Sequence, residues 1–120
     1  MADRVLVISW GDTVHGREER ALEVFNESLG LCGRLQQDGK IESFDVVLLD
    51  PTGDMAGYLE VHGSAEQINA LDDNEEFLRN TVDAALIVKN LRHTRGYTNE
   101  GVARQIGLYQ EAVGKVPQAS

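Results

Sequence analysis

Residues 41–62 read IESFDVVLLD (41–50), PTGD (51–54) and MAGYLEVH (55–62), and this stretch decides the fold. Its first and third parts are short runs rich in Val, Leu, Phe and Tyr, a composition typical of β-strands, so we predict strands over Ile41–Asp50 and Met55–His62. Pro51–Asp54 predicts a turn, because proline presets one backbone dihedral and glycine tolerates a positive φ. A link this short joins antiparallel strands, so the pair is a predicted β-hairpin.

The segment before the hairpin predicts a strand followed by a long helix. Val5–Trp10 (VLVISW) is short, apolar and partly β-branched, which is typical of a buried central strand. From Arg17 to Gln37, apolar residues recur at steps of three and four, the period of a helix with one apolar stripe. The members of this stripe are Leu22, Phe25, Leu29, Cys32 and Leu35.

The segment after the hairpin predicts further helices and a fourth strand. Ser64 and Gln67 have the S-x-x-Q spacing of a capping box, which marks the start of a helix. An acidic run at 72–76 divides this region into one broken helix or two short ones. Ala84–His93 (AALIVKNLRH) contains consecutive Leu, Ile and Val residues, and we predict the fourth strand there.

The last predicted element is a strongly amphipathic helix that begins after Thr98 or Asn99, either of which is a suitable N-cap. Its apolar residues recur at steps of four and three, and they are Val102, Ile106, Tyr109, Val113 and Val116. We therefore predict one domain over residues 1–116 and a short polar tail over residues 117–120.

The predicted order is strand, helix, strand, strand, helix, strand, helix. This is the β-α-β-β-α-β arrangement of the ferredoxin-like fold with one helix added, so the predicted class is α+β, with helices on one face of an antiparallel sheet. The first strand is apolar on both faces, whereas a solvated face alternates with polar residues. We therefore expect a homodimer in which a second copy covers the second sheet face. Alternatively, the last helix covers part of that face or embraces the partner.

Composition excludes several classes of partner. Aspartate and glutamate number 20 against 11 lysines and arginines, a net charge of −9, which disfavours binding to nucleic acids and to anionic membranes. The single cysteine, Cys32, cannot form an internal disulfide and lies on a helix stripe, so it is predicted to be a core residue in a reducing compartment. No signal peptide or membrane-spanning run is recognised, and a cytoplasmic location is expected.

The third strand supplies the candidate catalytic residues. Side chains alternate along a strand, so Leu59 and Val61 share the face under the helices, and Tyr58, Glu60 and His62 share the other face, toward the dimer interior. Glu60 and His62 are suited to act as an acid–base pair or as two ligands of a metal. The simpler interpretation is a solvated face of an edge strand. With three histidines and one cysteine and no metal-binding spacing, no metal site is predicted.

Two further residues are candidate ligand-binding groups, together with Tyr58 and His62. Trp10 ends the first strand, where an aromatic side chain can form the wall of a pocket, although it also suits a core or dimer interface. Arg95 follows the predicted fourth strand and is able to bind a carboxylate through two parallel hydrogen bonds. No phosphate-binding loop, dinucleotide fingerprint or nucleophile elbow is present, and no cofactor is predicted.

The sequence resembles small uncharacterised bacterial proteins of the dimeric α+β barrel superfamily, in which two ferredoxin-like units pack sheet to sheet. The resemblance lies in Gly16–Glu19 at the start of the first helix, Gly39–Phe44 entering the second strand, and Gly57–Ser64 from the third strand into a helix cap. It extends over nearly the whole chain, but these motifs are structural. The superfamily includes cofactor-free monooxygenases, haem-degrading enzymes, isomerase-like proteins and binding modules, and fold alone does not choose among them.

Three functions therefore follow as hypotheses. The first is a dimeric domain that binds a small hydrophobic or carboxylate-bearing molecule. The second is a cofactor-independent monooxygenase- or isomerase-like enzyme that acts on a small metabolite. The third is an interaction partner whose acidic surface binds a basic protein.

Overall fold

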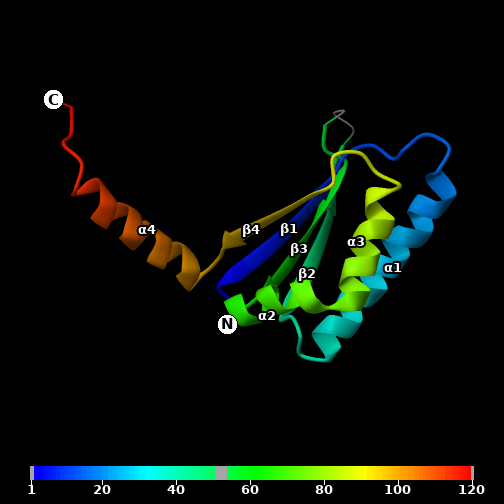
Figure 1. Cartoon of the computed structure of the whole chain (residues 1–120), viewed down its shortest axis with the longest axis horizontal. Helices are drawn as coiled ribbons and strands as arrows, with labels where there is room; N and C mark the ends of the chain where they lie inside the picture. The colour runs from blue at the N-terminus through cyan, green and yellow to red at the C-terminus, as the bar shows by residue number, and fades with distance from the viewer. Residues whose placement is uncertain (1, 51–53, 120) are drawn as a thin grey trace.

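The protein folds into one four-stranded antiparallel sheet with helices on one side, as the computed structural model in Figure 1 shows for residues 2–50 and 54–119. The strands lie in the order β2-β3-β1-β4. The elements are β1 (Arg4–Trp10), α1 (Glu18–Gln37), β2 (Ser43–Leu48), β3 (Gly57–Gly63), α2 (Ala65–Ala70), η1 (Leu71–Asp73), α3 (Glu75–Ala85), β4 (Arg92–Tyr97) and α4 (Glu100–Val113). This order is the predicted one, and the α+β class is confirmed. No helix among these residues is long and apolar enough to cross a membrane.

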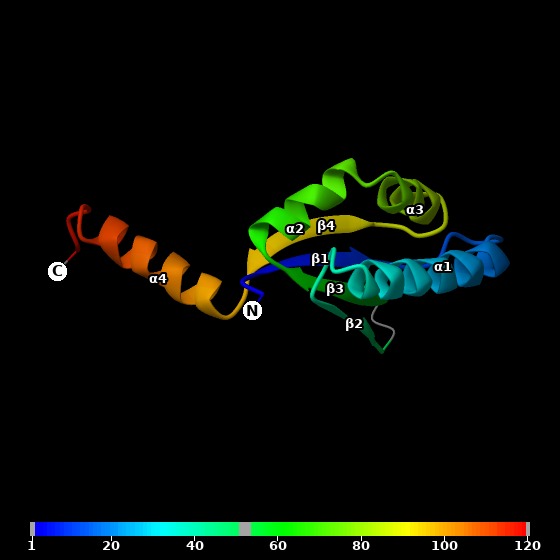
Figure 2. The ribbon, with the colours of Figure 1, turned by 90° about the horizontal axis from the view of Figure 1, so that it is seen from below.

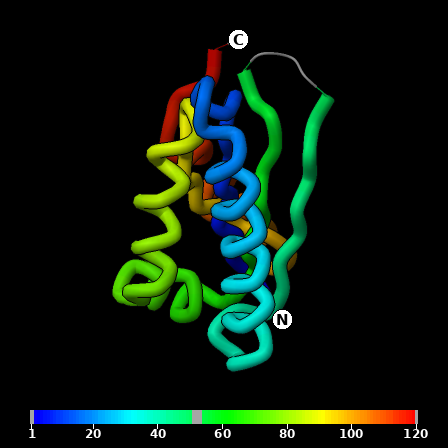
Figure 3. The backbone as a smooth tube through the Cα atoms, turned by 90° about the vertical axis from the view of Figure 1, so that its right-hand side faces the viewer, coloured from blue at the N-terminus to red at the C-terminus, as the bar shows by residue number. Residues whose placement is uncertain are grey.

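The hydrophobic core lies between the sheet and the helix layer, where α1 and α3 run side by side (Figure 3). Leu59 and Val61 of β3 are 5% and 1% exposed and face this layer, as predicted from their alternation. Cys32 is also a core residue, and burial raises the pKa of its thiol to about 11. The thiol is therefore protonated at neutral pH, as expected for an inert packing residue.

The predicted hairpin is confirmed, with β2 and β3 antiparallel but shorter than predicted. Their register pairs Ser43 with His62 and Leu48 with Gly57. The proposed turn at Pro51–Asp54 falls largely on residues 51–53, which lie outside the described residues. On its two sides, the Leu49 amide donates to the Ala56 carbonyl at 2.9 Å.

Side-chain caps explain where the central helices begin. Ser64 and Gln67 form the predicted capping box, in which the Gln67 amide donates to Ser64 Oγ at 3.1 Å and the Ser64 amide donates to Gln67 Oε1 at 2.8 Å. The region is a broken helix, as predicted: α2 and a single 3₁₀ turn precede α3, whose start is capped by Asn74.

The fourth strand lies later in the chain than predicted. Ala84 and Ala85 end α3, and β4 begins only at Arg92. The apolar run around Ile87 instead pairs with the loop after β1: Val14 donates to the Ile87 carbonyl at 2.9 Å, and Val88 forms an isolated bridge with Thr13. Ile87 is 6% exposed there, so its apolar character reflects burial under the loop. The actual strand, RHTRGY, is an edge strand and is correspondingly polar.

The sheet face turned away from α1, α2 and α3 has no described helix packed over it (Figure 1), and we call it the open face. Strand register and alternation assign twelve residues to it: Val5, Val7, Ser9, Ser43, Asp45, Val47, Tyr58, Glu60, His62, Arg92, Thr94 and Gly96. Its two central strands carry Val5, Val7 and Tyr58 but also Glu60 and His62, and its edge strands carry Asp45 and Arg92. It is therefore less uniformly apolar than the first strand alone indicates.

Candidate functional site

The main candidate site is a cavity of about 430 Å³ between the helix layer and the sheet, which we call the α1–α3 cavity. Its walls come from α1 and α3, from all four strands, and from the loops after β1 and before β4. Most of its lining is apolar and includes Ile8, Trp10, Leu22, Phe25, Leu59 and Phe77. Small side chains, Ala21 on α1 and Ala84 on α3, leave the space open.

Trp10 forms one wall of this cavity because a glycine lies beneath it. Gly57 pairs with Trp10 across β1 and β3, and a Cβ atom at residue 57 would lie 2.9 Å from Cζ2 of the indole. The indole also makes an edge-to-face contact with the Phe25 ring at a centroid distance of 6.2 Å. The position of Trp10 therefore depends on a residue with no side chain on the neighbouring strand.

A small polar cluster lies on the helix wall of the cavity. Ser28 Oγ on α1 lies 2.8 Å from the Val24 carbonyl oxygen and 3.0 Å from Asn80 Oδ1 on α3. Thr81 Oγ1 on α3 donates to the Phe77 carbonyl at 3.0 Å. Because each group has a partner within the protein, these residues offer a ligand few free hydrogen bonds, and the cavity is chemically an apolar site.

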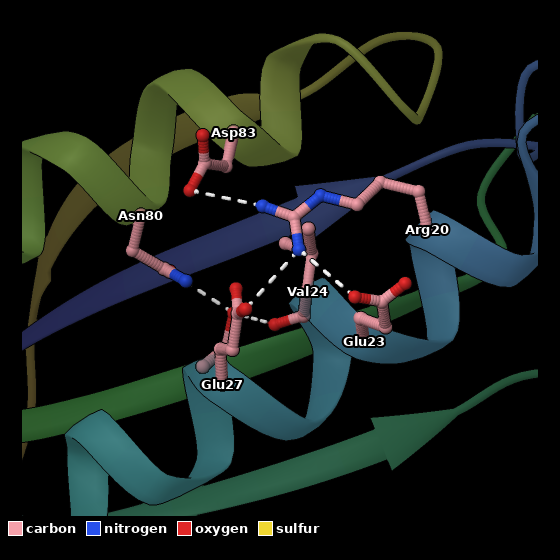
Figure 4. A network of polar contacts seen from close by, with 7 residues as sticks. Arg20, Glu23, Val24, Glu27, Asn80 and Asp83 are labelled. Carbon is pink, nitrogen blue, oxygen red and sulfur yellow. Dashed lines mark hydrogen bonds and ion pairs between the residues drawn. The ribbon is translucent and has the colours of Figure 1, made fainter.

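An ion-pair network joins the two helices beside the cavity (Figure 4). Arg20 on α1 lies 3.1 Å from Glu27 and 3.5 Å from Glu23 on its own helix, and 3.4 Å from Asp83 on α3. All four side chains are largely solvated, so each pair contributes little stability. The network bridges α1 and α3 next to Ala21 and Ala84, which line the cavity.

His93 is the one histidine among the described lining residues, and because the residue is exposed to solvent we place it at the cavity mouth. Its ring lies 5.9 Å from the Phe77 ring. Partial burial lowers the pKa of His93 below its usual value of 6.5, and the nearby Arg95 charge lowers it further, while Asp72 opposes the shift. The imidazole is therefore neutral at pH 7, the form that accepts a proton.

The structure separates the site residues predicted from the sequence into three places. Trp10 lines the α1–α3 cavity, whereas Tyr58, Glu60 and His62 lie on the open face, on the opposite side of the sheet. Arg95 faces the helix layer outside the cavity, where its guanidinium donates to Asn69 Oδ1 and pairs with Asp72, both at 2.6 Å. Both terminal nitrogens of the guanidinium, which were predicted to bind the carboxylate of a ligand, are therefore engaged by side chains of the protein itself.

The Glu60–His62 pair acquires a third member on the open face. His62 Nε2 lies 3.8 Å from Glu60 Oε1 and 3.9 Å from Asp45 Oδ2 of the neighbouring strand. The three ligand atoms lie within 4.8 Å of one another, a grouping that is able to converge on a cation. Asp45 is 70% exposed, however, and solvated acidic groups of this kind are common without a metal.

Comparison with known proteins places the fold but not the activity. No protein-family profile and no curated protein matches the chain. A dimeric ferredoxin-like protein of unknown function from Bacteroides fragilis NCTC 9343 is 14% identical, with a TM-score of 0.60 over 79% of this chain and 96% of that one. A second such protein, from Jannaschia sp. CCS1, is 12% identical, with a TM-score of 0.58 over 80% and 98%.

A third similar structure has a suggested activity. It is a proposed antibiotic biosynthesis monooxygenase from Chloroflexus aurantiacus J-10-fl, 15% identical, with a TM-score of 0.54 over 80% of this chain and 93% of that one. At these identities the likeness shows the fold alone. The protein is thus an α+β protein of the ferredoxin-like fold, as predicted from the sequence. It has an apolar cavity between its sheet and its helices.

Proposed function

We propose that this protein binds a small, mainly apolar molecule in the α1–α3 cavity. The observation that carries the proposal is the cavity itself: its volume of about 430 Å³ lies within the range of small-molecule sites, and its walls are largely aliphatic and aromatic. No lysine or arginine is among the described residues that line it. This favours the hydrophobic part of the predicted ligand class over the carboxylate-bearing part.

Filling the cavity is expected to abolish this binding. The probe is N-phenyl-1-naphthylamine, a neutral fluorophore that brightens in apolar surroundings, and Trp10, the only tryptophan, reports its arrival by quenching. Ala84→Phe places a ring in the cavity and should weaken probe binding roughly tenfold or more. The matched control is Ala85→Phe, since Ala85 is exposed and does not line the cavity. Equal affinities in the two variants, with both still folded by circular dichroism, would rule out this site.

We also propose that the protein is a homodimer formed through the open face. The support is physical: Val7, Val47 and Tyr58 are partly exposed on this face, and apolar surface left uncovered in water is unfavourable. Two structures of the same fold are described as dimeric. In such a dimer the Asp45–Glu60–His62 grouping would lie within the interface, while each α1–α3 cavity would stay within its own protomer.

An enzyme of the monooxygenase or isomerase type is the second candidate, and His93 favours it. A neutral imidazole at the mouth of an apolar cavity is suited to take a proton from a weakly acidic bound molecule. One structure of this fold is a proposed monooxygenase. The predicted pair Glu60 and His62 is less well placed for such a reaction, because it lies on the other face of the sheet.

This second candidate predicts proton exchange with 2-tetralone, an apolar ketone with an acidic α-hydrogen. The His93 imidazole would remove that proton to leave an enolate, and return of a deuteron in D₂O would give a mass increase. We expect exchange to be lost in His93→Gln and kept in His15→Gln, an exposed histidine outside the cavity. Because the pKa of His93 lies below 6.5, the rate should be level at and above pH 6.5 and should fall only as the pH drops through that lowered pKa. Exchange that is unchanged in His93→Gln would eliminate this role.

A further inference from the structure

The C-terminal helix α4 stands away from the rest of the chain and is attached only through its first turn (Figures 1 and 2). Either Thr98 or Asn99 was predicted to cap this helix; Asn99 holds the N-cap position, but its side chain makes no cap and instead donates to the Ala2 carbonyl at 2.6 Å. Arg104 forms an ion pair with Asp3 at 2.8 Å. Gly101 lies so close to the Asp3 carbonyl that a Cβ atom there would be 2.3 Å from its oxygen. The start of α4 is therefore firmly placed, and the rest extends freely.

The apolar stripe of α4 has no partner among the described residues of its own chain. Its five members are exposed by 37% to 68%: Val102 (46%), Ile106 (51%), Tyr109 (68%), Val113 (37%) and Val116 (60%). An isolated helix of 14 residues is marginally stable in water, and most helices in proteins are stabilised by packing one apolar face. The stripe is therefore expected to pack against something outside this chain.

The overall dimensions lead to the same conclusion. A compact domain of this length has a radius of gyration of about 14 Å. The value here is 17.2 Å, and the longest dimension is 56 Å. The structures of similar fold match about four-fifths of this chain and almost all of their own. The unmatched fifth is close in length to residues 100–120, so α4 has the size of an addition to the shared fold.

We propose that α4 is an arm whose apolar stripe packs on a second copy of this chain. The arm leaves the end of β4 on the side of the sheet away from α1 and α3, beside the open face (Figure 1). A copy that covers the open face therefore meets the arm directly, and twofold symmetry makes the second arm do the same in return. The inference rests on the proposed homodimer and adds the element that completes its interface.

The composition of the open face explains why the dimer needs the arms. Stable interfaces have an apolar core and a charged rim. The open face lacks a continuous apolar core, because Glu60 lies on central strand β3 opposite Val7, and Asp45 and Arg92 lie on the two edge strands. Two stripes of five apolar side chains supply the apolar area that the four short strands lack.

A matched pair of variants on α4 tests the arm. Ile106→Glu places a charge on the stripe, whereas Leu108→Glu places the same charge on another side of the helix, and the two residues are similarly exposed at 51% and 54%. By sedimentation velocity we expect Ile106→Glu to raise the dimer dissociation constant at least tenfold and Leu108→Glu to leave it within about twofold. If the dimer persists in Ile106→Glu but is lost on a substitution in the open face, the proposed role of the arm is wrong and the proposed sheet-face dimer stands. A monomeric wild-type protein would overturn both.

Photo-crosslinking identifies what the stripe contacts. Tyr109→p-benzoylphenylalanine is prepared in ¹⁴N and ¹⁵N forms, which are mixed, allowed to exchange subunits and irradiated. Crosslinked peptides of mixed isotope composition are expected if α4 packs on another copy. Crosslinks of uniform isotope composition alone would mean that α4 folds back on its own chain, and the proposal would be wrong. Neither result affects the cavity proposal, which the fluorescent probe tests separately.

Discussion

Replacing Val47 with aspartate is expected to convert the proposed homodimer into monomers while the chain stays folded. Val47 lies on the open face opposite Tyr58, on edge strand β2, and is only partly buried within one protomer. A carboxylate there remains hydrated in the monomer but loses its water in the dimer, at a cost of several kcal/mol. Twofold symmetry places two such charges in each interface. We therefore expect the dissociation constant to rise roughly 100-fold or more, since about 1.4 kcal/mol corresponds to a factor of ten.

The neighbouring residue supplies a control with the opposite result. Val46 belongs to the same strand but faces the helix layer and lines the α1–α3 cavity. Val46→Asp should therefore weaken binding of N-phenyl-1-naphthylamine and leave the dimer intact, whereas Val47→Asp should lose the dimer and keep probe binding. Both quantities are measurable on the same samples by sedimentation velocity and fluorescence titration. If Val47→Asp sediments as wild type, the open face is not the interface.

Features encoded by neighbouring residues could be predicted from the sequence. The hairpin, the capping box at Ser64 and the helix α1 each depend on spacings within a few residues, and each is present in the structure; Cys32 and Leu35 of the predicted α1 stripe are buried. The alternation of Leu59 and Val61 under the helices follows from the same local rule. These features are robust because backbone geometry alone fixes which side chains share a face.

Features that depend on distant packing were predicted less well. Ile87 and its apolar neighbours have a strand-like composition, but they pack against the loop after β1, and the polar segment from Arg92 takes the edge position instead. Leu22 belongs to the apolar stripe of α1 and is nevertheless 67% exposed, because it lies at the rim of the cavity and not in the core. Tertiary contacts override local preference in both cases.

The candidate site was harder to predict than the fold for the same reason. Among the site residues predicted from the sequence, only Trp10 lines the cavity. The order of residues along the chain did not indicate that Phe25, Phe77 and Ala84 would line the cavity together with Trp10. A cavity is the volume that remains between elements far apart in the chain, and no spacing rule describes it. The one local sign was Gly57, which lies opposite Trp10 and has no side chain to fill the space beneath the indole.

Gly57→Ala is therefore expected to damage both stability and the cavity. A Cβ atom at this residue would lie 2.7 Å from the Val47 carbonyl oxygen, which belongs to the backbone of β2, and 2.9 Å from the Trp10 indole. Relieving the first contact requires a shift of the hairpin backbone, and relieving the second requires a shift of the indole. Overpacking of this kind lowers the free energy of unfolding by about 1–3 kcal/mol. The displaced ring should also weaken binding of N-phenyl-1-naphthylamine.

The same substitution in α1 should have the opposite effect on stability. Gly33 is exposed within the helix, and a Cβ atom there would meet nothing within 4 Å. Gly33→Ala is expected to raise the free energy of unfolding by up to about 1 kcal/mol, because alanine has the higher helix propensity. Urea unfolding measures both variants, and the two shifts should differ in sign. A Gly57→Ala protein as stable as Gly33→Ala would mean that the contact between β3 and Trp10 is loose, and that Trp10 is not held against the cavity by this packing.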